Sequence, residues 1–118
     1  MFKILIAEDD AELRQLFSRV LTKNGYNVKG ISNGREALDC MENDFFDLII
    51  SDIMMPEVDG YEFVRLLREC NDKTPVLMIT AKDAFDDMRQ GFDSGTDDYM
   101  VQPVNVNEMV LRVGALLR

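Results

Sequence analysis

The stretch LIISDIMMPEVDG, from Leu48 to Gly60, combines a strand pattern, an acid and a turn. Leu48–Ser51 is short and mostly apolar, and it leads directly into a single carboxylate, Asp52. Pro56 and Gly60 then bracket a turn with the sequence PEVDG. A short apolar run that ends at turn residues is typical of a buried strand. Asp52 is therefore a candidate functional residue, because a charged side chain rarely lies beside a protein core.

Short apolar runs recur along the chain, at Phe2–Ala7, Tyr26–Ile31, Val76–Thr80 and Tyr99–Val101. Between them, apolar residues recur every three or four positions, which is the period of an amphipathic helix. Five such helical stripes begin at Leu13, Ala37, Phe63, Phe85 and Met109. Strands that alternate with helices form a parallel sheet that is covered on both faces. We therefore predict one α/β domain over residues 1–118, with five strands and five helices.

Cap residues predict where these helices begin and end. Asp10 precedes the first stripe, and its carboxylate is suited to accept the free N–H groups of a first helical turn. Ser32 or Asn33 is expected to cap the second helix in the same way. Gly25 should end the first helix in a left-handed conformation.

The composition excludes several classes of function. The net charge is −9, so the surface repels phosphate backbones and the chain alone is not expected to bind nucleic acid. Histidine is absent, which rules out a histidine-based catalytic triad and a histidine-ligated zinc site within this chain. No apolar run approaches the ~20 residues needed to cross a bilayer. We therefore expect a cytoplasmic location and no membrane partner.

Carboxylates directly follow two of the predicted strands. Glu8, Asp9 and Asp10 come after the first strand, and Asp52 comes after the third. In a doubly wound sheet the site lies beyond the carboxyl ends of the strands, so these acids should meet at one edge. Converging carboxylates need a cation, and oxygen-only ligands favour Mg²⁺, with Mn²⁺ as an acceptable substitute. The competing interpretation is that each acid merely caps the following helix, and it suits Asp10 best.

Four motifs, in this order and spacing, resemble the receiver domain of bacterial two-component response regulators. They are LIAEDD at residues 5–10, SDIMMPEVDG at 51–60, MITA at 78–81 and GTDDYMVQP at 95–103. The resemblance covers essentially the whole chain. It implies a flavodoxin-like doubly wound sheet with strand order 2-1-3-4-5. It also implies a signalling domain rather than an enzyme, one that assists only its own Mg²⁺-dependent phosphorylation and dephosphorylation.

The resemblance assigns a role to the acids at the strand ends. Asp52 matches the aspartate that accepts a phosphoryl group from the phosphohistidine of a sensor histidine kinase. Asp9, Asp52 and the backbone carbonyl of Met54 match the magnesium ligands. Glu8 matches the other member of the acidic pair, which acts on the metal through water.

Three further positions concern the response to phosphorylation. Thr80 matches the hydroxyl that binds a phosphoryl oxygen, and Tyr99 matches the aromatic switch that moves inward with it. The family nearly always has lysine where this chain has Gln102, and glutamine brings no positive charge. Two hypotheses follow. Either Asp52 is phosphorylated and the switch is weakly coupled, or the chain is a degenerate receiver that acts as a phosphorylation-independent interaction module.

The last third of the chain is similar to the receivers of winged-helix transcription factors. Asp98, Glu108 and Arg112 match a homodimer face built from the fourth helix, the fifth strand and the fifth helix, with Asp98 and Arg112 as one ion pair. The alternative for these charges is a solvated helix surface. The resemblance implies control of transcription, with DNA bound only through a C-terminal domain after Arg118. We therefore expect residues 1–118 to be the N-terminal fragment of a longer regulator.

Two other functions fit parts of this pattern. A flavodoxin-like electron carrier would need a loop of Ser, Thr and Gly after the first strand, whereas the acidic EDDAE at residues 8–12 would repel a flavin phosphate. A Mg²⁺-dependent phosphatase with an aspartyl intermediate would usually show Asp-x-Asp. Asp52 is followed by Ile53 and Met54, so the second acid is missing. Turnover of a phosphomonoester would favour the phosphatase.

Overall fold

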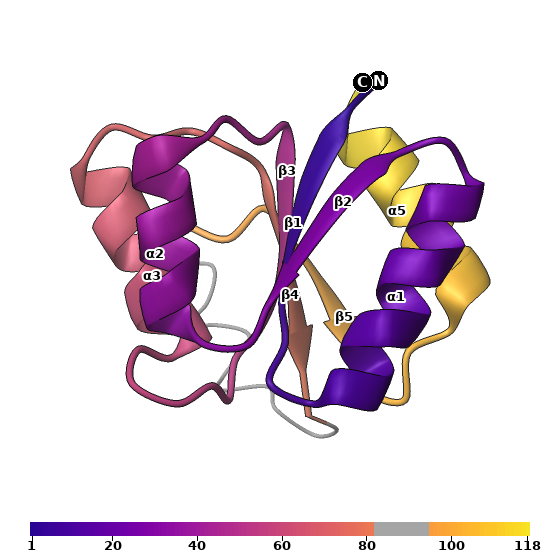
Figure 1. Cartoon of the computed structure of the whole chain (residues 1–118), viewed down its shortest axis with the longest axis horizontal. Coiled ribbons are helices and arrows are strands. Elements are labelled where there is room, and N and C mark those ends of the chain that lie inside the picture. The colour runs from indigo at the N-terminus through magenta and orange to yellow at the C-terminus, as the bar shows by residue number, and fades with distance from the viewer. Residues whose placement is uncertain (82–94) are drawn as a thin grey trace.

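The computed structural model is a three-layer α/β structure, and in the part of the chain that it describes a parallel sheet separates two pairs of helices (Figure 1). It describes residues 1–81 and 95–118. The strands are β1 (Lys3–Ala7), β2 (Asn27–Ile31), β3 (Leu48–Asp52), β4 (Val76–Thr80) and β5 (Asp98–Val101). The helices are α1 (Ala11–Lys23), α2 (Gly34–Asn43), α3 (Gly60–Glu69) and α5 (Val106–Leu116).

The strands lie in the order β2-β1-β3-β4-β5, and all neighbouring pairs are parallel. This order confirms the flavodoxin-like sheet that the resemblance implied. The boundaries differ from the predicted ones by a residue at some ends. The third strand extends through Asp52, because the backbone of Asp52 still pairs with Ile79 of β4. The predicted fourth helical stripe, with Phe85, Met88 and Phe92, lies outside the described residues.

The sheet buries both of its faces, which explains why its strands are apolar along most of their length. Leu5 and Ala7 of β1 pack in a core with residues of α2 and α3. Ile4 and Ile6 of the same strand pack in a second core with residues of α1 and α5. Figure 1 shows the two helix pairs on opposite faces of the sheet. The carboxyl edge of the strands is thereby held on a rigid support.

The helix caps decide between the alternatives that the sequence left open. Asp10 accepts the N–H groups of Glu12 and Leu13 at 3.0 and 3.2 Å, so it is the N-cap of α1. Asn33, rather than Ser32, caps α2. Gly25 follows α1 with a φ of 92°, as the predicted left-handed end requires. No helix in residues 1–81 and 95–118 is long and apolar enough to span a bilayer.

Candidate functional site

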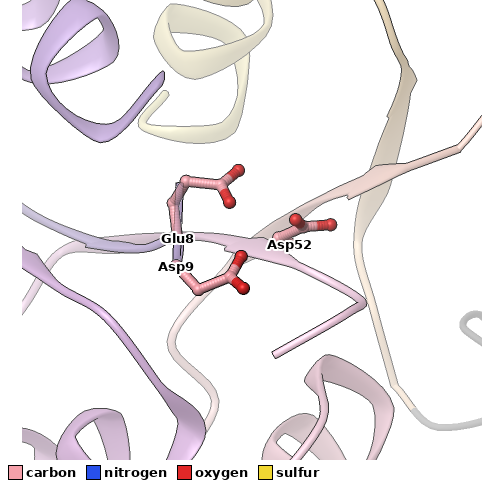
Figure 2. Close-up of side chains that lie close together, drawn as sticks. All are labelled: Glu8, Asp9 and Asp52. Carbon is pink, nitrogen blue, oxygen red and sulfur yellow. The ribbon is translucent and has the colours of Figure 1, made fainter. Parts of the chain in front are cut away.

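Three carboxylates meet at the carboxyl edge of β1 and β3 (Figure 2). Glu8 and Asp9 directly follow β1, and Asp52 is the last residue of β3, which pairs with β1. One carboxylate oxygen of each residue lies within 4.8 Å of the others. The expected convergence of these acids is therefore confirmed. Asp10 takes no part in this cluster, because its carboxylate caps α1.

Glu8 is the most deeply buried member of the cluster, with 2% of its surface exposed. Its Oε2 accepts the N–H of Asp10 at 3.1 Å, whereas Oε1 is buried with no hydrogen-bond partner among the described residues. Burial raises the pKa of Glu8 to about 8, the backbone N–H of Asp10 opposes this rise, and the charge of Asp52 adds to it. A buried negative charge without a partner is costly, so the Glu8 carboxylate should either be protonated or lie close to a cation.

Asp52 is half-buried beside Glu8. Burial raises its pKa, while hydrogen bonds from Glu8 and from the backbone of Met54 and Ile53 lower it. The Met54 N–H lies 3.4 Å from Oδ1 of Asp52. Burial of two neighbouring carboxylates thus favours a proton on Glu8 when no cation is close to it.

The residues present fit a hard divalent cation. The donor set consists of carboxylate oxygens, and the unpartnered Oε1 of Glu8 is one of the few buried polar atoms that lack a partner in the described residues. Asp9 is exposed and Asp52 half-exposed, whereas Glu8 lies behind them in the interior. The backbone of Met54 lies next to the Asp52 carboxylate. Such a set would hold Mg²⁺ or Mn²⁺ at the surface, with Glu8 in a position to act through water.

The loop after Asp52 is held against the strand by Gly60. The N–H of Gly60 donates to the carbonyl of Ile53 at 2.8 Å. A Cβ at this position would lie 2.4 Å from the backbone oxygen of Asp52, so no side chain fits. The sequence alone identifies Pro56 and Gly60 only as turn residues. The structure adds that Gly60 allows the close approach that positions Asp52.

Arg14 is a positioning residue that the sequence reasoning missed. From α1, its Nη1 donates to the backbone carbonyl of Glu8 at 2.7 Å. This hydrogen bond ties the first turns of α1 to the end of β1, where Glu8 and Asp9 begin the cluster. The position of Arg14, four residues after the cap residue Asp10, does not by itself predict this contact.

Thr80 and Gln102 occupy the other half of the same edge. Thr80 ends β4 directly after Ile79, the partner of Asp52, and its side chain is fully buried. The N–H of Gln102 donates to the carbonyl of Thr80 at 2.9 Å, which places Gln102 two strands away from Asp52. Gln102 is half-buried and lines a mostly apolar pocket of about 540 Å³ that Leu13 and Phe17 of α1 also line.

Tyr99 lies in β5, opposite Met78 of β4, and its side chain is buried in the core on the α2 and α3 side. The aromatic residue expected to act as a switch thus occupies an inward position here. Further along β5 and α5, Nη1 of Arg112 donates to both carboxylate oxygens of Asp98, at 3.0 and 2.9 Å. Arg112 also pairs with Glu108 at 3.1 Å. The expected Asp98–Arg112 ion pair is therefore present, within one chain.

Comparison with known proteins agrees with this geometry. Residues 4–114 match the family model of the response regulator receiver domain. The response regulator MprA of Mycolicibacterium vanbaalenii is 41% identical over 116 residues, which are 98% of this chain and 50% of that protein. MprA of Mycobacterium avium is 40% identical over 98% of this chain and 51% of its own length. The chain thus spans about half the length of the curated relatives it matches.

Solved structures lead to the same family. The receiver domain of the Francisella response regulator 1452 has a TM-score of 0.95 and 33% identity, covering 99% of this chain and 97% of that one. The chemotaxis response regulator CheY4 of Vibrio cholerae has a TM-score of 0.93 and 34% identity, covering 99% of each chain. From the family model, the relatives and the acidic edge of the sheet, we conclude that the chain belongs to the response regulator receiver domain family.

Proposed function

We propose that this chain is a phosphoacceptor switch in which Asp52 takes a phosphoryl group from a sensor histidine kinase in the presence of Mg²⁺. The observation that carries this proposal is the cluster of Glu8, Asp9 and Asp52, whose oxygens lie within 4.8 Å of one another. In the proposal, Asp9, Asp52 and the carbonyl of Met54 hold the metal, and Glu8 acts on it through water. The kinase supplies the histidine that this chain lacks.

The chemistry requires a carboxylate that is positioned and partly desolvated. Asp52 forms an O–P bond while the P–N bond of the donor phosphohistidine breaks, and the imidazole nitrogen keeps the bonding electron pair. The metal, when bound, neutralises charge on the carboxylate and on the transferring phosphoryl group. The hydroxyl of Thr80, on the adjacent strand, then donates to a phosphoryl oxygen, and Tyr99 follows as the aromatic part of the switch.

A second candidate function is a degenerate receiver that acts as an interaction module without phosphorylation. Gln102 favours it, because a neutral amide two strands from Asp52 cannot supply the charge of the family lysine. Both candidates share the fold and the acidic edge. They differ in whether Asp52 accepts a phosphoryl group from a small-molecule donor.

Intact mass spectrometry separates the two candidates. The chain is incubated with phosphoramidate or acetyl phosphate and Mg²⁺, and the wild type should gain about 80 Da, the mass of one phosphoryl group. Asp52→Asn should gain nothing, and chelation of the metal should prevent labelling of the wild type. If the wild type remains unlabelled while Gln102→Lys is labelled, the phosphoacceptor function is wrong and the interaction module is favoured.

We further infer that the switch controls transcription from the cytoplasm, as the receiver part of a longer regulator. The supporting observations are the relatives named response regulators, which are about twice as long, and the Asp98–Arg112 pair on β5 and α5. Phosphorylation would strengthen a homodimer through β5, α5 and the predicted fourth helix, which lies outside the described residues, and DNA would be bound by a C-terminal domain. Sedimentation of the labelled chain should show a dimer that Arg112→Ala weakens. An unchanged monomer after full labelling would contradict this part of the proposal.

A further inference from the structure

A groove lies between the carboxyl-terminal ends of α2 and α3, away from the acid cluster. It consists of two cavities of about 500 and 310 Å³ that share Met41 and Asp72 in their walls. The larger cavity is also lined by Asp47 and Pro75, the residues that precede β3 and β4. Since β3 runs from this edge to Asp52, the groove lies roughly 16 Å from the phosphoacceptor. A partner bound here would leave the acidic edge accessible.

The wall of the groove formed by α2 and the following loop carries a row of apolar side chains. Leu38, Met41 and Phe45 recur at three- and four-residue spacing and line the two cavities. Phe46 is fully buried in the core, whereas the adjacent Phe45 is 70% exposed. Leu66 of α3 lines the opposite wall. An exposed phenylalanine beside two half-buried apolar side chains is a surface suited to contact a partner.

The rim of the groove is acidic. Among the described residues that line the two cavities, Lys73 is the one basic residue, and the carboxylates are Glu42, Asp44, Asp47, Glu69 and Asp72. Lys3 pairs with Asp44 and Arg65 pairs with Glu69, so two of the five charges are compensated. Of the other three, Asp47 and Asp72 each accept a backbone N–H, and Glu42 is exposed. This combination complements a ligand that is apolar on one side and positively charged on the other.

We propose that the groove binds a cationic amphipathic helix of a partner protein. The apolar face of that helix would lie on Met41 and Phe45, and its lysine or arginine side chains would contact Glu42 and Asp72. A nucleic acid or an anionic membrane would be repelled by the same rim, and a second copy of this chain would bring its own net charge of −9. The inference does not depend on phosphorylation of Asp52, and so goes beyond the proposed function.

The test is an NMR titration of the ¹⁵N-labelled 118-residue chain. The probe is a peptide of about 14 residues with leucine at helical three- and four-residue spacing and lysine elsewhere. The control peptide has the same composition in scrambled order, which removes the apolar face but keeps the charge. We expect saturable shifts at the amides of Met41, Phe45 and Asp72, and at least about fivefold weaker binding of the scrambled peptide.

Matched variants separate the groove from general attraction to an acidic surface. Phe45→Ala and Glu42→Lys should each raise the Kd about fivefold. Their controls are Leu111→Ala, a leucine on α5 that is 73% exposed, and Glu12→Lys on α1, and neither should change the Kd more than about twofold. The proposal is overturned if the shifts gather on another face or spread over the surface. Equal binding of the scrambled peptide, or equal weakening by the controls, would also overturn it.

Discussion

The carboxyl edge of the sheet has two halves that differ in charge. At the ends of β1 and β3, three carboxylates crowd together, and burial raises the pKa of both Glu8 and Asp52. At the ends of β4 and β5, the corresponding residues are Thr80 and Gln102, which are neutral. Within residues 1–81 and 95–118, the neutral half supplies no positive charge to the acidic half; Lys82, which follows Thr80 by two positions, lies outside these residues. The acidic half therefore depends on protons or on a bound cation, and a change to either half should be measurable.

The largest effect should come from titration of Glu8. Between pH 4.5 and about 8 the folded protein keeps a proton on Glu8 that the unfolded chain has lost. This contribution to the free energy of unfolding is complete below pH 4.5, and it is lost as the pH rises through about 8. In metal-free buffer, urea unfolding should show the free energy of unfolding falling by about 3–4 kcal/mol across this range.

Two controls belong to this titration. Glu8→Gln should remove most of the decrease, because the glutamine amide stays neutral over this whole pH range. Added Mg²⁺ should stabilise the wild type more at pH 8 than at pH 5, since the metal binds ionised carboxylates of the folded state. A wild-type profile as flat as that of Glu8→Gln would show that Glu8 is not the group that holds the proton.

The next largest effect should come from Gly60→Ala, which disturbs the backbone behind Asp52. The new Cβ would lie 2.4 Å from the Asp52 carbonyl oxygen, and the expected loss is about 2–3 kcal/mol of unfolding free energy. Gly114→Ala in α5 is the matched control, because nothing lies within 4 Å of its Cβ. That variant should be neutral or up to about 1 kcal/mol more stable. Equal effects of the two variants in urea unfolding would refute the close-contact role of Gly60.

A smaller effect is expected when charge is added to the neutral half. Gln102→Lys should speed phosphoramidate labelling of Asp52 about tenfold, because a cation stabilises the negative charge that gathers there. Gln102→Met, which keeps the side chain neutral, should change the rate less than about twofold. Time-resolved intact mass measures both rates. If Gln102→Lys is labelled no faster than Gln102→Met, the missing positive charge does not limit the rate of Asp52 phosphorylation.

The smallest effect concerns the part-exposed ion pair between Asp98 of β5 and Arg112 of α5. A double-mutant cycle with Asp98→Asn and Arg112→Gln should give a coupling of about 0.5–1 kcal/mol, because solvent weakens a pair that is part-exposed. Thermal or urea unfolding of the four proteins measures it. A coupling above about 2 kcal/mol would mean that Asp98 and Arg112 stabilise the monomer as a buried pair does.

The acid cluster was predictable from the sequence, whereas its supports were not. Asp9 and Asp52 follow apolar runs that become adjacent parallel strands, so the strand-end rule places them together. The contact of Gly60 with the Asp52 carbonyl depends on how a whole loop folds back on its strand. The hydrogen bond from Arg14 to the Glu8 carbonyl depends on the side-chain path across the start of α1. Neither leaves a periodic pattern in the chain.

Four features can be predicted from the sequence alone: the alternation of strands and helices, the edge where the site lies, the acids that reach it and the missing charge at Gln102. These follow from short-range patterns, because apolar period and strand-end position are local properties. Two features required the folded structure: the burial of Glu8, which favours a proton near neutral pH, and the acid-lined groove between α2 and α3. The burial of Glu8 and the shape of the groove depend on segments that are distant in the sequence. These segments exclude water from a residue only once the helices pack onto the sheet.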